Sequence, residues 1–170
     1  FWRREGMTHK IDVALLFPPL WYFATVPADL SSNVGALTAA GVAVRAWDLS
    51  AGFTHHLLGR HPAFLALQQW DTYLDQRLQR QASADLFKAA AEAGQRHQAE
   101  WRLRALRLRC DPTHIPSALG VALDVETNPT LPYLMEAVGE VLEHRPQVIA
   151  IALVHPDQVP HALALARLLR

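Results

Sequence analysis

The chain lacks paired cysteines, an excess of charge of either sign and a long apolar run. Cys110 is its one cysteine, which excludes an internal disulfide or a three-cysteine cluster and suits a reducing cytoplasm. Sixteen basic and sixteen acidic residues balance, which argues against nucleic acid or an anionic membrane as a partner. No apolar stretch reaches the roughly 18 residues that span a bilayer. With 51% hydrophobic residues, we expect a cytoplasmic protein with a packed core.

Three apolar runs predict buried strands. They cover residues 12–17, 42–47 and 148–154, and each is continuous rather than alternating. Continuous runs are typical of parallel strands with helices on both faces. Helical patterns lie between them, so the sequence predicts an α/β fold with a doubly wound, Rossmann-like parallel sheet. Three strands make this sheet incomplete, and we expect the chain to be the front part of a larger protein.

Local signals predict the helices. Asp29 or Ser31 is expected to cap a first helix, and Gly41 is expected to end it in the left-handed conformation. Two long helical patterns follow, over residues 62–78 and 83–108, and prolines and a glycine favour a loop over residues 110–128. Another helix is expected at 131–142, and a last one follows the third strand.

These patterns divide the chain into three parts. Residues 1–8 form an N-terminal tail. Residues 9–58 and 127–170 form the incomplete α/β domain. Residues 59–126 form a helical insertion between the second and third strands, because this segment is too long for an ordinary crossover.

The loop after the first strand is the best candidate for ligand contact. Doubly wound sheets bind ligands beyond the carboxyl ends of their strands, and Pro18 and Pro19 end this strand. The aromatic residues Trp21, Tyr22 and Phe23 suit either a large flat ligand or packing against the domain edge or another domain. Both interpretations stay open.

Polar residues follow the second and third strands. Asp48 stands where an acidic residue holds a ribose in dinucleotide-binding sheets, but the first turn lacks the G-x-G-x-x-G pattern, so a strand-end turn is favoured. His155, Asp157 and Gln158 lie in the exit loop of the third strand, beside the same crevice. We favour Asp157 as a helix N-cap over Asp157 as a ligand contact.

The remaining reactive side chains form no catalytic or metal-binding pattern. His55, His56 and His61 have no cysteine or carboxylate at ligand spacing, and we expect them in solvent. The arginines between residues 102 and 109 are expected on a solvated helix face. Cys110 has no activating base nearby in sequence, so an idle thiol is the default. We assign no catalytic residue and no metal ligand.

The two ends of the chain resemble the amino-terminal domain of cobalamin-binding radical SAM enzymes. That family opens with a strand, Pro-Pro, often Trp, a Pro-led helix, Gly before the second strand and a closing Asp-Leu. The matching residues are Pro18, Pro19, Trp21, Pro27, Gly35, Leu37, Gly41, Asp48 and Leu49. Phe53 and residues 57–58 are similar to a subgroup with a helical insertion, the type that matures peptide natural products. Residues 146–170 resemble the family's third strand and helix, with Gln158 and residues 162–167 as the matching part.

The resemblance implies a cobalamin lying on the carboxyl ends of the strands. It also implies a downstream radical SAM barrel, absent here, whose C-x-x-x-C-x-x-C motif holds a 4Fe-4S cluster and cleaves S-adenosylmethionine, and a methyltransferase activity. The implied cobalamin contacts are Pro18, Pro19, Leu20, Trp21, Asp48, Leu49, Ser50, His155, Asp157 and Gln158. The cobalt-binding Asp-x-His-x-x-Gly motif is missing, because LSAGF follows Asp48. No lower cobalt ligand is therefore assigned.

Two other functions stay open. The strand, the helix ending in Ala-Gly and the second strand also suit the N-terminal domain of a sugar-nucleotide glycosyltransferase, although such domains usually carry glycines where Pro18 and Pro19 stand. The chain also suits a non-catalytic binding module, since it has no catalytic constellation. In that case the insertion, with Trp70 or Trp101, would be the partner surface.

Overall fold

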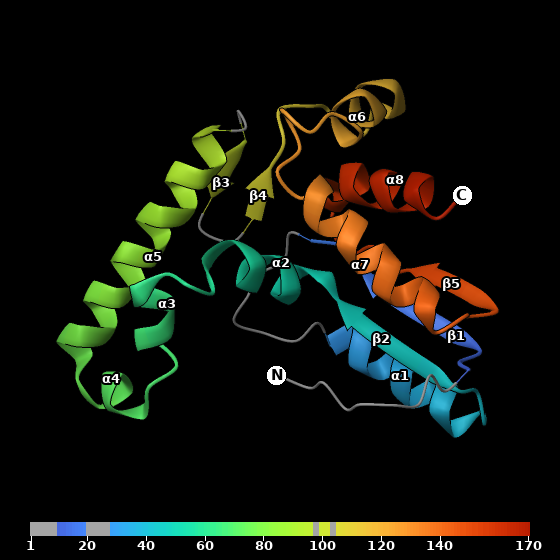
Figure 1. Ribbon diagram of the computed structural model, residues 1–170, viewed down its shortest axis with the longest axis horizontal. Coiled ribbons are helices and arrows are strands. Elements are labelled where there is room, and N and C mark those ends of the chain that lie inside the picture. The colour runs from blue at the N-terminus through green and yellow to red at the C-terminus, as the bar shows by residue number, and fades with distance from the viewer. Residues whose placement is uncertain (1–9, 20–27, 97–98, 103–104) are drawn as a thin grey trace.

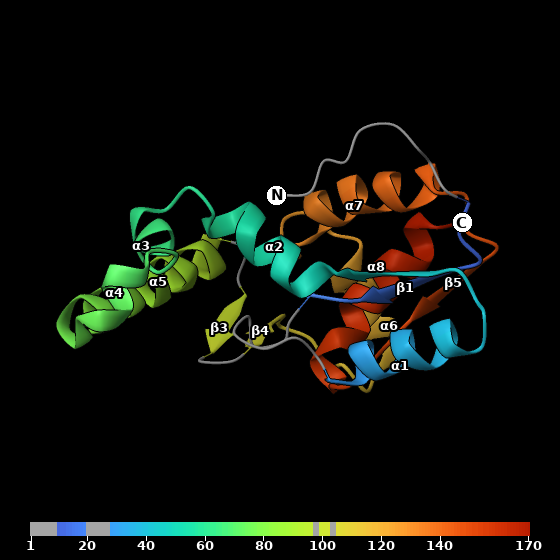
Figure 2. The ribbon, with the colours of Figure 1, turned by 90° about the horizontal axis from the view of Figure 1, so that it is seen from below.

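The chain forms an open parallel sheet with helices on both faces (Figures 1 and 2). The structure, a computed structural model, describes residues 10–19, 28–96, 99–102 and 105–170. The sheet contains β1 (Val13–Phe17), β2 (Val44–Asp48) and β5 (Val148–Ile151), all parallel, in the order β2-β1-β5. The predicted fold class, an incomplete doubly wound sheet, is confirmed.

Successive residues of the central strand β1 face two different helical layers. Leu15 and Phe17 pack with Leu30 of α1 (Ala28–Ala39). Ala14 and Leu16 pack into the main core, which also contains α7 (Leu131–Glu143) and α8 (Val159–Leu168). Figure 2 shows α7 and α1 on opposite sides of the sheet. Burial on both faces explains why the sequence of β1 is apolar without alternation.

Gly41 ends α1 as the sequence predicts. Its φ is +78°, in the left-handed region that glycine adopts without a steric penalty. The amide of Gly41 donates to the carbonyl of Thr38 at 3.0 Å, and the amide of Val42 donates to that of Leu37 at 3.0 Å. Because Val42 completes this turn, β2 begins at Val44 and not at residue 42. The helix begins at Ala28, so the expected cap at Asp29 or Ser31 is wrong.

The region between β2 and α7 differs most from the prediction. It contains α2 (Leu49–Leu58), α3 (Pro62–Ala66), α4 (Trp70–Leu74), α5 (Gln76–Arg96), β3 (Glu100–Arg102), β4 (Ala105–Arg107) and α6 (Ile115–Ala122). The helix expected over 83–108 ends at Arg96, and β3 pairs with β4 as an antiparallel hairpin. Arginine alternates with apolar residues from 102 to 104 and from 107 to 109, a period that favours a strand, so the predicted helical arginine face is wrong.

The segment 110–128 was expected to be a loop, but it contains α6. Pro116 lies in the first turn of this helix, where its missing amide costs no hydrogen bond. Ala118 and Ala122 are fully buried, so a short apolar face holds the helix against the rest of the fold.

In both ribbon views α3, α4 and α5 lie away from the sheet, and we call these three helices the helical arm. No helix in the described residues is long and apolar enough to cross a membrane.

The third strand is shorter than the apolar run 148–154. The amide of Ala152 still donates to the carbonyl of Leu16 at 2.9 Å, but β5 ends at Ile151. Beyond it, the amides of Val154 and His155 donate to the side chain of Gln158 and no longer join the ladder. At these two residues the side chain of Gln158 therefore replaces β1 as the hydrogen-bond partner. The apolar sequence of residues 148–154 does not indicate this change of partner.

Candidate functional site

The three strands of the sheet end at one edge. The register pairs Phe17 with Asp48 and Leu16 with Ile151, so the exits of β1, β2 and β5 start at a common level. The chain leaves β1 toward β2 on one side, whereas β5 lies on the other side. The topological switch point therefore lies between β1 and β5, the place where doubly wound sheets bind ligands. We call residues 18–19, 48–50 and 152–158 the carboxyl edge.

Gln158 joins the exits of β1 and β5 at this switch point. Its side chain is fully buried. Oε1 accepts hydrogen bonds from the amides of Val154, at 2.8 Å, and His155, at 3.1 Å, and Nε2 donates to the carbonyl of Pro18 at 3.1 Å. The three bonds use most of the amide's capacity, so Gln158 forms the floor of the switch point and positions both exits.

Asp48 has the strand-end role that the sequence favours. It is the N-cap of α2, and its Oδ1 accepts hydrogen bonds from the amides of Ser50 and Ala51 at 3.0 Å each. The next two candidate residues point inward: Leu49 belongs to the main core, and Ser50 is buried. This exit therefore offers a capped helix start, with the Asp48 carboxylate only partly exposed.

The exit of β5 is capped by a different residue from the one predicted. His155, not Asp157, is the N-cap of the short 3₁₀ turn η1 (Pro156–Gln158). Nδ1 of His155 accepts the amide of Asp157 at 3.2 Å and lies 3.5 Å from Oδ2 of Asp157. The N-cap prediction for Asp157 is wrong, because the imidazole nitrogen two residues earlier reaches the same amide. His155 remains largely exposed, while Asp157 is partly covered.

The candidate residues fall into two groups around β1. Pro18 lies beside the β5 exit through its bond to Gln158, and the Asp48–Ser50 exit lies on the other side of β1. Pro18 and Pro19 are both buried, so they support this edge from within. Leu20 and the aromatic residues 21–23 lie outside the described residues, and their predicted contacts stay predictions.

The thiol of Cys110 lies close to this edge. Burial raises its pKa, and the carboxylates of Asp157 and Asp111 raise it further. A thiol with a raised pKa stays protonated near neutral pH and is a poor nucleophile or metal ligand. Because Asp157 affects the pKa of Cys110, the segment after β4 lies close to the exit of β5. The sequence does not indicate that these two segments are neighbours.

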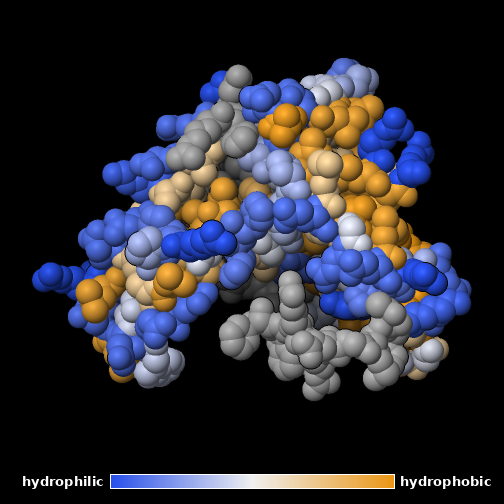
Figure 3. Space-filling model, in the orientation of Figure 1, coloured by the Kyte–Doolittle hydropathy of each residue, from blue (hydrophilic) through white to orange (hydrophobic). Residues whose placement is uncertain are grey.

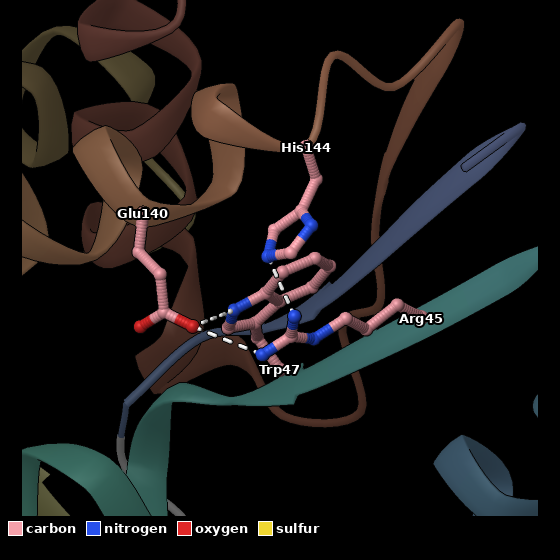
Figure 4. A network of polar contacts seen from close by, with 4 residues as sticks. All are labelled: Arg45, Trp47, Glu140 and His144. Atoms are coloured by element: carbon pink, nitrogen blue, oxygen red, sulfur yellow. Dashed lines mark hydrogen bonds and ion pairs between the residues drawn. The ribbon is translucent and has the colours of Figure 1, made fainter. Parts of the chain in front are cut away.

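A polar network between β2 and α7 was not predicted (Figure 4). Oε1 of Glu140 accepts hydrogen bonds from Nε1 of Trp47 and from Nη2 of Arg45, at 3.1 Å each. Nε2 of His144 accepts a hydrogen bond from the second terminal nitrogen of Arg45, Nη1, at 2.5 Å. The guanidinium also stacks over the Trp47 ring, 4.7 Å from its centroid. Arg45 and Trp47 are two residues apart on a strand, and Glu140 and His144 are four apart along a helix, so each pair shares one face. The sequence does not indicate that these two faces contact each other.

A second polar cluster is buried beneath α6, α7 and α8. The hydroxyl of Thr130 donates to Oδ1 of Asn128 at 2.7 Å, so Nδ1 of His161, also at 2.7 Å, donates to that hydroxyl. All three side chains are fully buried, and Nε2 of His161 has no partner among the described residues. Burial lowers the pKa of His161 to about 3, so the imidazole is neutral. This cluster fastens α8 to the start of α7.

The other histidines take local roles. His55 packs edge-on against Phe64, and Nδ1 of His61 accepts the amide of Ala63 as the cap of α3. His56 lies 5.5 Å from Tyr133, centroid to centroid. In the part of the chain that the structure describes, no three His, Cys, Asp or Glu side chains are grouped as a metal site.

We find no protein-family model, no curated protein and no solved structure that matches this chain. The inference about function therefore depends on the geometry of the carboxyl edge and on the sequence resemblance.

Proposed function

We propose that this chain is the cobalamin-binding N-terminal portion of a radical SAM enzyme, of the methyltransferase type. The observation that supports the proposal is the strand order β2-β1-β5, which puts a switch point between the exits of β1 and β5. Gln158 holds these two exits at a fixed separation. A ligand at this place would rest on an edge whose shape is set by the sheet.

The donor set at the carboxyl edge suits a ligand held by contact and not by coordination. Asp48 and Gln158 are engaged in backbone hydrogen bonds, and Nδ1 of His155 accepts an amide. We therefore assign no residue here as a cobalt ligand. Asp157, which is partly exposed, supplies a polar contact for the corrin side chains, while the buried Pro18 and Pro19 support the edge from within.

The chemistry belongs to the cofactor, and the protein supplies binding and orientation. When bound, cobalamin supplies methyl-transfer chemistry, while the 4Fe-4S cluster and S-adenosylmethionine would belong to a downstream barrel domain.

Apolar side chains gather over α6, α8 and the β5 side of the molecule (Figure 3). Exposed apolar side chains there include Ile115 and Leu119 on α6, Val148 on β5 and Leu153 just after β5. This surface supports the proposal of a covering domain.

Hydroxocobalamin tests the proposal directly. The 170-residue chain is mixed with the cofactor, passed over a gel-filtration column and examined for the corrin absorbance that travels with the protein. We expect retained absorbance in a stoichiometric ratio. Uridine diphosphate glucose is tested in parallel by calorimetry, because binding of the nucleotide in place of the corrin would favour a glycosyltransferase domain and overturn the proposal.

A matched pair of histidines locates the site. His155→Asn removes the ring at the carboxyl edge but leaves a side chain that can cap η1, and we expect it to weaken cobalamin retention several-fold. His144→Asn makes the same change before β5, at the opposite end of the sheet, and should leave retention unchanged. No retained corrin with the unmodified chain, or equal effects of the two variants, would count against this assignment.

A further inference from the structure

The surface of the helical arm is hollowed by an open cavity of about 550 Å³, a size typical of small-molecule sites. The cavity lies between α3, α4 and α5 and contains none of the carboxyl-edge residues. Its lining residues include Ala63, Ala66, Thr72, Ala82, Asp85 and Glu92. It is therefore independent of the cobalamin proposal.

The floor of the cavity is apolar and well supported. Ala63 and Ala82 are buried members of a hydrophobic cluster that also contains Leu58, Leu86 and Ala90. Small side chains on α3 and α5 leave the space open, and the larger residues behind them hold the two helices together. An apolar part of a ligand would contact this floor without any rearrangement of the core.

One hydroxyl group, that of Thr72, belongs to the wall of the cavity. Thr72 is only 7% exposed. Its backbone amide donates to the carbonyl of Gln69 at 3.2 Å, but no hydrogen bond engages its side chain within the described residues. The oxygen is not among the fully buried atoms that lack a partner in the described residues, so water reaches it, and a ligand in the cavity would meet a hydroxyl that is free to donate or accept.

The rim of the cavity carries more negative than positive charge. Asp85 and Glu92 both line it, about 10 Å apart along α5, since seven residues separate them at about 1.5 Å each. Asp85 accepts a hydrogen bond from Gln81 at 3.0 Å. Lys88 lies between the two acids and forms no ion pair with either in the described part of the chain. Two carboxylates against one ammonium favour a cationic ligand.

We propose that this cavity binds a small organic ammonium compound with an apolar body. The apolar body lies on the alanine floor, the ammonium group sits near the carboxylate of Asp85, and the hydroxyl of Thr72 accepts or donates a hydrogen bond. This is a second binding site, in the part of the chain that the family resemblance matches only as a helical insertion.

Two probes with the same tail and opposite charge test the proposal. The full 170-residue chain is titrated with octylammonium and with octanoate by isothermal calorimetry at low ionic strength. We expect saturable binding of octylammonium and binding of octanoate that is at least about tenfold weaker, a difference of about 1.4 kcal/mol. Equal binding of the two, or no saturable binding of octylammonium, would overturn the proposal.

Variants then place the probe in the cavity. Ala82→Phe fills the floor and should abolish octylammonium binding, and Asp85→Asn should weaken it several-fold. Thr72→Val keeps the volume of the side chain and removes its hydroxyl, and it should weaken octylammonium binding. This variant tests the site even where Ala82→Phe fails to fold. Asp71→Asn changes an exposed acid on α4 that does not line the cavity. Binding that Asp71→Asn weakens as much as Asp85→Asn would mean a nonspecific charge effect and would refute the site.

Discussion

Gln158 shows how much one buried polar side chain contributes at the switch point. Its amide satisfies two backbone amides and one carbonyl from two different strand exits. The sequence places Gln158 near a crevice, but it does not show that the side chain turns inward, because its partners lie 140 residues away at Pro18 and nearby at Val154. Contacts of that separation depend on the register of the sheet.

Replacement of Gln158 by leucine should destabilise the protein by about 3 kcal/mol. Leucine fills a similar volume but leaves the amides of Val154 and His155 and the carbonyl of Pro18 without their partner, and each unsatisfied buried group costs about 1–3 kcal/mol. Urea unfolding measures the change. Gln147→Leu is the control, since the side chain of Gln147 is exposed and donates to Oδ1 of Asp12 at 3.0 Å. Equal losses in the two variants would contradict the structural role of Gln158.

His161 should make stability depend on pH. Its pKa is about 3 in the folded protein against an ordinary value of 6.5, so between these values the unfolded chain binds a proton that the folded chain does not. The stability that the neutral imidazole contributes is therefore present above pH 6.5 and is lost as the pH falls, by about 1 kcal/mol per pH unit.

Urea unfolding between pH 7 and pH 4 checks this prediction. His161→Leu should flatten the dependence, because leucine has no proton to bind. His114→Leu, at an exposed histidine whose side chain caps nothing, should keep the slope of the unmodified protein. An unchanged slope in His161→Leu would show that other groups cause the acid sensitivity.

At the scale of the elements, sequence patterns work where one physical cause dominates. The central strand β1 is apolar because both its faces are covered, and Gly41 is favoured where φ is positive, so both features could be predicted. The strands β2 and β5 lie at the edges of the sheet and are only partly buried, which their apolar runs do not indicate. The hairpin of β3 and β4 was missed because its period-two pattern is short and follows directly on a long helix. In α6, Pro116 suggested a break although it lies in the first turn.

The sequence predicts that the three strand ends lie at one edge of the sheet, but not the roles of single residues there. Adjacent strand ends locate the carboxyl edge, because the topology alone fixes it. The roles of single residues depend on local geometry: His155 reaches the amide that Asp157 was expected to serve. The network of Arg45, Trp47 and Glu140 depends on how α7 lies over β2, which no spacing in the sequence specifies.

The start of α2 offers a test of what Asp48 does. Its carboxylate caps the amides of Ser50 and Ala51, so Asp48→Ala should cost about 1 kcal/mol, whereas Asp48→Asn should cost only a few tenths because asparagine is an equally good cap. Thermal or urea unfolding measures both variants. If Asp48→Asn keeps its stability but loses cobalamin retention, the charge serves the ligand; if both properties survive, Asp48 is a cap alone.

At the scale of the whole molecule, the sheet has an open edge at β5. The amides of Val148 and Ala152 donate to β1, so those of Ile149 and Ile151 point away from it, because successive amides of a strand alternate in direction. Val148 is 55% exposed beside them, and Leu153 and Val154 continue the apolar surface. An open edge with apolar side chains is a place where another strand or domain adds.

Val148→Lys should therefore reduce concentration-dependent self-association of the chain. A lysine on an edge strand keeps the backbone geometry but makes the approach of a second strand unfavourable, since its charge would have to lose water. Sedimentation velocity over a range of protein concentrations measures the effect. Leu74→Lys is the matched control, because Leu74 is 69% exposed on α4, far from the sheet in both ribbon views. Association that Leu74→Lys abolishes and Val148→Lys does not would show that the helical arm, and not the β5 edge, is the surface at which the molecule meets its partners.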